Sequence, residues 1–280
     1  MSTRIDEAAK QDIGRILEQR QANGADFWAT EDGRVGVGEP FSTISAMLLL
    51  HELGLDASHE AVAGGLEALL RNWREDGRIR VGPKGAIYPC HTANIARVLC
   101  RFGLADEERL QTTLQQLLED RHEDGGWRCK RAPLGKSAIT DASNPGVTLF
   151  ALDALRFDPR NLDSPDLGPT IETLLAHWDS KVPTGPCQFG IGTLFKQSEY
   201  PFLRYNLFFY VYVLSFYPYA RHDKRFGEAA QLLSDKLNED GQLIIERPHR
   251  GLADFELCKK GQPSQWATLR FAEIQENLAG

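Results

Sequence analysis

Two kinds of helical pattern alternate along the chain. In four segments apolar residues recur every three or four positions, as in a helix with one buried face: 58–73, 105–120, 167–178 and 222–237. Other segments are apolar nearly all round: 44–53, 94–104, 146–155 and 206–217. A helix with one apolar stripe lies on a surface, whereas a helix that is apolar all round is buried on both sides. The alternation therefore predicts helical hairpins in two layers, with the amphipathic helices outside and the apolar helices inside.

A short turn motif recurs between these segments. "DGRVGVG" begins at Asp32, "DGRIRVG" at Asp76, "DGGWRC" at Asp124 and "DGQLIIE" at Asp240, while "TGPCQFGIG" from Thr184 occupies the remaining place without the aspartate. Such self-similarity at a fixed period is the signature of a repeat architecture. We predict an all-α fold, an α/α toroid (a partial or open α-α barrel) of about five helical hairpins. It would form one domain over 1–280, with repeats near 5–54, 57–103, 105–157, 167–217 and 222–277.

Loop lengths indicate one end of this toroid as the place for a site. Connections from inner to outer helices are short, as at 53–58 and 102–106, whereas those from outer to inner helices are long, as at 121–143 and 179–201. The long loops and the N-termini of the inner helices therefore gather at the same end. Long loops on a rigid scaffold commonly carry sites, and helix N-termini favour anions. We expect the functional site there.

Composition and charge narrow the class of protein. The 280 residues are 42% hydrophobic and 25% charged, as in a globular protein with a core. The net charge of −7 argues against nucleic-acid binding, which needs a basic face. No run reaches the ~18–20 apolar residues of a membrane span, and the charged N-terminal segment 1–20 lacks an apolar signal core. These features predict a cytoplasmic protein, and five cysteines without a C-x-x-C pair argue against a disulfide framework.

The turn and its flanking helices resemble a known repeat. "DGGWRC", "QTTLQQLLEDRH", "PCHTANIARVL" and "QPSQWATLRFAEI" are similar to the prenyltransferase/squalene-oxidase repeat of small bacterial proteins. The same repeat builds squalene and oxidosqualene cyclases, class II terpene cyclases and protein prenyltransferase β subunits. The resemblance covers most of the chain, and it implies an α/α toroid that binds a polyprenyl or terpenoid molecule in a central cavity.

The sequence also departs from that family. Closed toroids there typically use more hairpins, so the ring would be open or completed by a partner such as a second copy. Arg121 stands where the cyclase turn has glutamine, and the protonating D-x-D-D motif is absent. The zinc set of prenyltransferase β subunits is missing from its usual context, as is the D-D-x-x-D motif of class I terpene synthases.

Asp141 in "TDASNP" is the nearest counterpart to the missing protonating motif. A carboxylic acid that protonates an alkene must be kept neutral by its surroundings. His91 and Asn144 are the residues expected to orient Asp141. The alternative is that "TDASNP" caps a helix, because Asp, Ser and Asn are N-cap residues and Pro145 suits a first helical turn.

Three cysteines fall at the loop end of the predicted toroid: Cys90, Cys129 and Cys187. Thiolates, together with imidazole and carboxylate groups such as His91 and Asp141, are the usual ligands of zinc. Zinc is therefore the one cofactor that the sequence brings into consideration. The alternative is that these are free cysteines, which are commonly buried as small hydrophobic residues.

Aromatic residues are concentrated in the segment 200–217. Phe202, Tyr205 and Phe209, with Trp127 from the repeated turn, are the predicted lining of a cavity, because aromatic faces stabilise cations. Arg204 is a candidate clamp for a diphosphate or a carboxylate. The alternative is a packed core, with Arg204 paired to a carboxylate of a neighbouring repeat.

Two functions of different class remain at this point. The first is a terpenoid- or polyprenyl-binding toroid with a small hydrophobic, isoprenoid-like ligand, acting as a terpene cyclase- or prenyltransferase-like enzyme if it is catalytic. The second is a non-catalytic helical-repeat protein that binds a protein partner.

Overall fold

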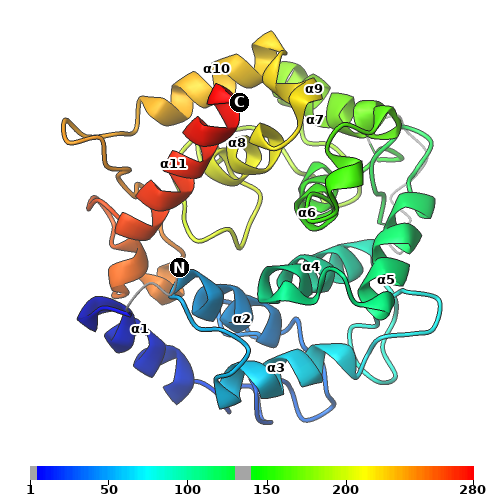
Figure 1. The fold of residues 1–280 in the computed structure, drawn as a ribbon, viewed down its shortest axis with the longest axis vertical. Coiled ribbons are helices and arrows are strands. Elements are labelled where there is room, and N and C mark those ends of the chain that lie inside the picture. The colour runs from blue at the N-terminus through cyan, green and yellow to red at the C-terminus, as the bar shows by residue number, and fades with distance from the viewer. Residues whose placement is uncertain (1–4, 130–139) are drawn as a thin grey trace.

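The computed structural model describes residues 5–129 and 140–280. The described residues form α-helices joined by turns and short 3₁₀ or π segments, which confirms the all-α prediction (Figure 1). The helices are α1 (Glu7–Glu18), α2 (Thr43–Glu52), α3 (Glu60–Leu70), α4 (Pro89–Leu99), α5 (Glu108–Glu119), α6 (Pro145–Leu155), α7 (Gly168–Ser180), α8 (Leu207–Ser215), α9 (Pro218–Arg221), α10 (Lys224–Ser234) and α11 (Gln265–Ala279).

The helices form two concentric layers around a common centre. Figure 1 shows α2, α4, α6, α8 and α11 inside and α1, α3, α5, α7 and α10 outside, which confirms the predicted toroid. Every residue of α6 and α8 is buried, whereas α5 and α10 bury only one stripe. This is the difference that the hydrophobic patterns predict. Within the described ranges, no helix is both long and apolar enough to cross a bilayer.

The repeated turn has the same backbone geometry in each hairpin. Gly33, Gly77, Gly125, Gly185 and Gly241 all have φ between 73° and 93°, in the region that glycine adopts most readily. The residue two positions after the glycine then enters the core in three of the repeats, where its N–H donates to a threonine of the next inner helix. These donors are Ile79, Trp127 and Leu243, and the acceptors are the hydroxyls of Thr92, Thr148 and Thr268.

Trp127 belongs to this hairpin architecture. Its side chain is fully buried, and its indole N–H donates to the Leu117 carbonyl of the preceding outer helix at 2.9 Å. Its position is equivalent to those of Ile79 and Leu243, which are also fully buried. The tryptophan therefore wedges the turn against its own hairpin.

The two ends of the chain meet. The buried carboxylate of Asp12 on α1 accepts hydrogen bonds from the backbone N–H groups of Glu256 and Leu257, at 3.1 and 2.8 Å. The first and last hairpins therefore contact each other directly, which closes the ring between α1 and the segment before α11 (Figure 1).

The aromatic-rich segment is divided between a loop and a helix. Helix α8 begins only at Leu207, where the Asn206 side chain caps it by accepting from the Phe209 N–H at 2.9 Å. Tyr200, Phe202 and Tyr205 therefore lie in the loop before the helix. The predicted apolar segment 206–217 thus corresponds to α8, whose start is fixed by this cap.

Candidate functional site

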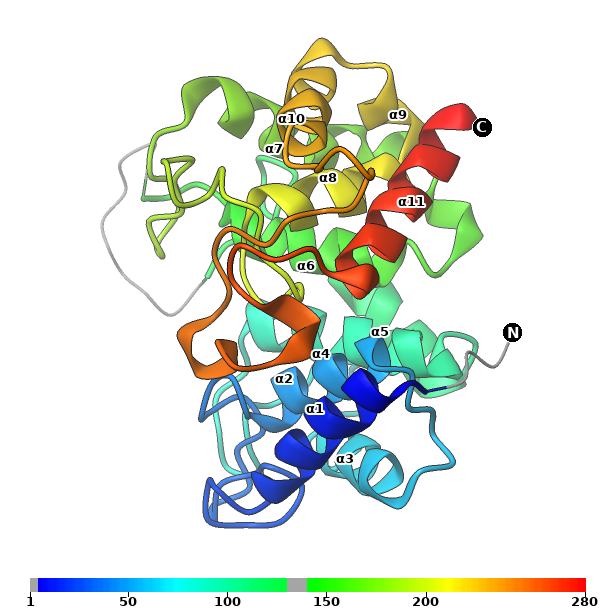
Figure 2. The ribbon, with the colours of Figure 1, turned by 90° about the vertical axis from the view of Figure 1, so that its left-hand side faces the viewer.

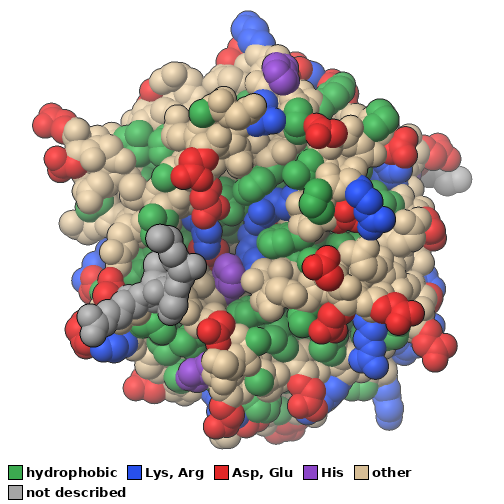
Figure 3. Space-filling view, viewed as in Figure 1, with side chains coloured by type: hydrophobic (Ala, Val, Ile, Leu, Met, Phe, Trp, Pro, Cys, Tyr) green, Lys and Arg blue, Asp and Glu red, His purple; other side chains and the backbone are tan. Residues whose placement is uncertain are grey.

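A hollow opens at the centre of the ring, on the side where the inner helices end. Figure 3 shows positively charged side chains and a histidine inside it. Its volume is about 310 Å³, and it is lined by Arg101, Arg156, Arg270, His51 and Tyr212 together with Phe157, Phe216, Glu273, Glu276 and Asn277. The long loops lie toward the opposite end (Figure 2). The expectation of a site at the loop end therefore does not match the place of this hollow.

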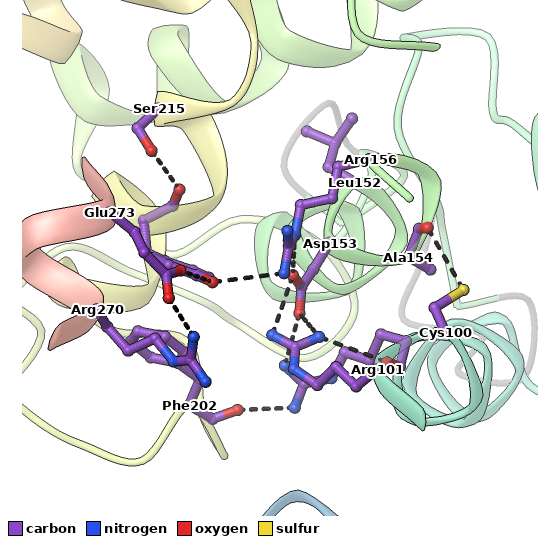
Figure 4. A network of polar contacts seen from close by, with 12 residues as sticks. Cys100, Arg101, Leu152, Asp153, Ala154, Arg156, Phe202, Ser215, Arg270 and Glu273 are labelled. Carbon is purple, nitrogen blue, oxygen red and sulfur yellow. Dashed lines mark hydrogen bonds and ion pairs between the residues drawn. The ribbon is translucent and has the colours of Figure 1, made fainter. Parts of the chain in front are cut away.

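Three arginines converge on one buried carboxylate beneath the hollow. The Asp153 carboxylate on α6 lies 3.3 Å from Arg97 Nη1, 2.8 Å from Arg101 Nη1 and 2.8 Å from Arg156 Nε (Figure 4). Asp153 and Arg97 are completely buried. Burial alone would raise the pKa of Asp153, but the three guanidinium charges outweigh it and hold that pKa well below its ordinary value.

Arg97 is itself enclosed by aromatic rings. Its guanidinium lies 4.7 Å from the ring centre of Phe150 and 4.9 Å from that of Phe209, and its Nη2 donates to the Phe202 carbonyl at 2.7 Å. Aromatic faces attract cations, and a desolvated arginine benefits most. The cation in the aromatic core is thus a side chain of the protein, which fits the packed-core reading of these rings.

A second charged group lies on the other wall of the hollow. Arg270 on α11 contacts the Glu52 carboxylate of α2 at 2.8 Å and also pairs with Glu273. The Tyr200 hydroxyl donates to Glu52, and the Tyr212 hydroxyl donates to Glu273 at 2.7 Å. Burial opposes ionisation of Glu52, but the charge of Arg270 outweighs it and lowers the pKa of Glu52 to about 2. The carboxylates and guanidinium groups on both walls are therefore ionised at neutral pH.

His51 of α2 borders the hollow as an uncharged group. Burial lowers its pKa to about 4, so the imidazole is neutral near pH 7. Its Nδ1 atom is buried and has no hydrogen-bond partner among the described residues. A buried polar atom without a partner is costly, and the residue that carries this one lines the hollow.

The charges and shape of this region suit a small anion. Arg156 and Arg270 each use two of the five N–H donors of a guanidinium in the contacts with Asp153, Tyr212, Glu52 and Glu273. Both arginines line the hollow, and its walls also include Phe157, Tyr212 and Phe216. Guanidinium groups bind carboxylates and phosphates through such paired donors.

A second pocket with a mixed polar and apolar lining adjoins the hollow. It has a volume of about 550 Å³ and shares His51, Arg270, Glu273 and Glu276 with the hollow. Its other walls combine apolar side chains with polar ones from the N-terminal segment, the end of α2 and helix α11: Ile5, Leu53, Trp266 and Leu269, and Asp6, Glu52 and Gln265. The hollow and the adjoining groove, whose apolar part is formed by Ile5, Leu53, Trp266 and Leu269, have volumes within the ~300–1,000 Å³ typical of small-molecule sites.

The arginine cluster was missed at the level of sequence, although a signal was present. Arg97 and Arg101 are four residues apart, and Asp153 and Arg156 three apart, on or at the end of helices that are otherwise apolar. Residues at such spacings share a helix face. Charged residues on buried helices are rare unless they are paired, so their occurrence on two neighbouring inner helices points to one buried network.

The predicted acid and its two neighbours lie at the other end of the ring. Asp141 is at the surface, with its side chain 48% exposed and its carboxylate 2.8 Å from Arg128 Nε. His91 is in the first turn of α4, and burial lowers its pKa. Asn144 is the N-cap of α6, followed by Pro145 at its first position. Among the described residues Asp141 is paired with Arg128 rather than with His91 or Asn144, so its role as an acid stays a prediction.

The predicted lining residues have protein partners. Phe202 and Phe209 are buried and stack on each other with ring centres 5.1 Å apart. The Tyr205 hydroxyl lies 2.9 Å from His177 Nδ1. Arg204 Nε contacts the buried Glu199 carboxylate at 2.6 Å. With Trp127 in the turn, this set is part of the packed interior or its edge, and its binding role stays a prediction.

The three predicted metal-ligating cysteines come from three different hairpins. Cys90 lies in the first turn of α4, Cys129 follows the Trp127 turn and Cys187 is in the loop after α7. Burial raises the pKa of Cys90 to about 12, and Cys129 and Cys187 add to that rise. Within residues 5–129 and 140–280, no three His, Cys, Asp or Glu side chains are grouped as a metal site would require. The zinc hypothesis thus gains no support from this geometry.

Comparisons with known proteins add little beyond the fold. No family model matches the chain, and no curated protein matches it. A protein from Actinoplanes is 14% identical with a TM-score of 0.42, over 98% of this chain and 99% of its own. A variant of the type II terpene cyclase MstE from Scytonema, in complex with geranylgeranyl dihydroxybenzoate, is 15% identical with a TM-score of 0.47, over 97% and 75% of the two chains. The apo form of MstE is 13% identical with a TM-score of 0.38, over 96% and 98%. These values indicate a similar helical fold at most and carry no argument about activity.

Proposed function

We propose that this protein binds a small amphipathic anion of the polyprenyl type, with its anionic head in the central hollow and its apolar chain in the adjoining groove. The observation that carries the proposal is the continuity of the two cavities through His51, Arg270 and Glu273. A purely apolar ligand would cover the guanidinium groups of Arg101 and Arg156 without accepting hydrogen bonds from them. A purely polar ligand would leave the apolar part of the groove, at Trp266 and Leu269, uncovered.

The position of the ligand's anionic head group is inferred from the charged side chains around the hollow. Around Asp153 three guanidinium groups face a single carboxylate, and the further pair of carboxylates, Glu52 and Glu273, is shared with Arg270. Four cations therefore face three buried or half-buried carboxylates, and Glu276 adds an exposed fourth. An anion placed among Arg101, Arg156 and Arg270 would accept hydrogen bonds from the guanidinium groups that line the hollow.

The position of the ligand's apolar chain is inferred from the residues that line the groove. Trp266 and Leu269 of helix α11 both line the groove, and Leu269 has 61% of its surface exposed. Large exposed hydrophobic residues that line a pocket commonly mark a binding surface. Covering Leu269 would contribute about 1.5–3 kcal/mol, the value for full burial of a leucine side chain.

Binding can be measured by titration calorimetry with three probes: farnesyl diphosphate, farnesol and inorganic pyrophosphate. The proposal expects farnesyl diphosphate to bind at least about tenfold more tightly than either fragment, because only it uses both cavities. Equal affinities of farnesol and farnesyl diphosphate would remove the head-group assignment. Absence of binding by all three would leave the protein-binding repeat as the better reading.

Two substitutions on α11 form a matched pair for the groove. Leu269→Glu places a carboxylate in the groove, whereas Leu278→Glu does so on the same helix, at a residue that is 40% exposed and lies outside the groove. We expect Leu269→Glu to weaken farnesyl diphosphate binding by about 10–100-fold and Leu278→Glu to leave it unchanged. Equal effects of the two variants would contradict the placement of the chain.

A further inference from the structure

The loop end of the ring holds a pair of cysteines that the central hollow does not use. Cys129 and Cys187 come from neighbouring repeated turns, and the Cys129 thiol lies close enough to Cys187 to raise its pKa. Cys187 is exposed and Cys129 is partly buried, so small solutes can reach the pair. These two are 58 positions apart in the sequence, so the fold rather than the chain brings them together.

Asn144 holds the two cysteine segments in place. Its backbone N–H donates to the Trp127 carbonyl at 2.9 Å, two residues before Cys129. Its side-chain oxygen accepts from the Cys187 N–H at 3.2 Å, and its Nδ2 lies 3.5 Å from the Cys187 sulfur. One residue at the start of α6 therefore contacts both segments, which fixes the approach of the two thiols.

Two glycines permit this close approach. A Cβ atom at Gly185 would lie 2.3 Å from the Asn144 side-chain oxygen, and one at Gly126 would lie 2.6 Å from the Thr148 hydroxyl. Gly185 also has φ of +75°, which disfavours other residues. The loop that carries Cys187 is thus docked tightly on α6, and its position relative to Cys129 is well defined.

We propose that Cys129 and Cys187 form an oxidisable dithiol, which a peroxide converts into an intramolecular disulfide between two hairpin loops. A pair suits this chemistry better than a metal, because no third metal-ligating side chain joins it in a metal-site arrangement among the described residues. Cys90 is also close enough for Cys129 and Cys187 to raise its pKa, but it is more deeply buried than Cys187.

The reaction balances with hydrogen peroxide as the oxidant. One cysteine, as the thiolate, attacks a peroxide oxygen, the O–O bond breaks, and hydroxide leaves and is protonated to water. The second thiolate attacks the sulfur of the resulting sulfenic acid, the S–O bond breaks, and a second water leaves. The two thiols lose two protons and two electrons, and the peroxide is reduced to two waters.

The rate of this reaction depends on the thiolate fraction. Burial and the neighbouring Cys129 raise the pKa of Cys187, so the thiol form dominates at neutral pH. Crosslinking should therefore be slow at pH 7 and accelerate as the pH rises above it.

Peptide mapping of the full-length protein tests the proposal. After treatment with hydrogen peroxide and alkylation of free thiols, mass spectrometry should find a peptide pair joined through Cys129 and Cys187, with Cys100 and Cys258 still alkylated after denaturation. The crosslink should raise the Tm by several degrees, because it constrains the unfolded chain. Cys187→Ser should abolish the crosslink, and Cys90→Ser should retain it.

Three outcomes would overturn the proposal: no joined peptide after peroxide treatment, a crosslink through Cys90 in place of Cys129 or Cys187, or stoichiometric zinc that protects these thiols. Far-UV circular dichroism of Cys187→Ser separates loss of the crosslink from loss of the fold. Because this cysteine is exposed, we expect the variant to fold as the unchanged protein does.

Discussion

Replacing Asp153 by asparagine would remove the counter-charge of three arginines. The side chains of Arg97 and Asp153 are fully inaccessible, and those of Arg101 and Arg156 are only 3% and 11% exposed. Asparagine has nearly the same shape but no charge, so the cost is electrostatic rather than steric. Breaking a buried ion pair by removing one partner costs about 3–5 kcal/mol, because it leaves a buried charge uncompensated.

The effect can be measured by urea unfolding followed by circular dichroism. We expect Asp153→Asn to lower the free energy of unfolding by about 3–5 kcal/mol. Glu67→Gln is the matched control, because it neutralises one partner of the exposed Arg71–Glu67 pair, and exposed pairs contribute about 0–1 kcal/mol. An anion bound among the arginines would recover part of the loss, so pyrophosphate should stabilise Asp153→Asn more than the unchanged protein.

A small loss of stability would contradict this role of Asp153. If Asp153→Asn unfolds within about 1 kcal/mol of the unchanged protein, the three arginines do not depend on that carboxylate. If pyrophosphate stabilises both proteins equally, the arginines do not form the anion site.

Three further predictions concern other parts of the ring. The pKa of Glu52 is about 2 in the folded protein and about 4.5 when unperturbed, so its contribution to stability is complete above pH 4.5 and is lost as the pH falls toward 2. Glu52→Gln should therefore flatten the decline of unfolding free energy with falling pH, and an unchanged slope would contradict the ion pair with Arg270. Gly185→Ala should destabilise the fold by about 1–3 kcal/mol in urea unfolding, because alanine meets both the positive φ and the contact with Asn144; a neutral effect would show that the loop can shift. Asp141→Asn should change stability by about 1 kcal/mol or less, because its pair with Arg128 is half-exposed; if turnover is found and this variant abolishes it, the acid role of Asp141 is supported.

The repeat and the two layers could be predicted from the sequence because both depend on local patterns. Residues near Asp76, Asp124 and Asp240 share a turn motif, and the same backbone geometry follows from it in each hairpin. Helices that are apolar all round, such as α6 and α8, could only be placed inside. The position of Trp127 as a wedge in its turn was also predictable, because equivalent positions carry apolar residues.

The site could not be predicted in the same way. Long loops and helix N-termini favoured one end, but the hollow depends on four arginines from α4, α6 and α11 and their neighbours, which become adjacent only when the ring closes. Aromatic residues such as Phe209 are compatible with a cavity or with a core, and only the position of Arg97 shows which faces are already occupied. Burial and pairing of charges are properties of the tertiary structure, so local sequence patterns constrain them weakly.

A crystal structure of the protein with farnesyl diphosphate would test the central claim most directly. We expect diphosphate density among Arg101, Arg156 and Arg270, with the farnesyl chain running along Trp266 and Leu269. Density at the loop end near Asp141 and Arg204, or a central hollow that stays free of ligand at saturating concentration, would contradict it.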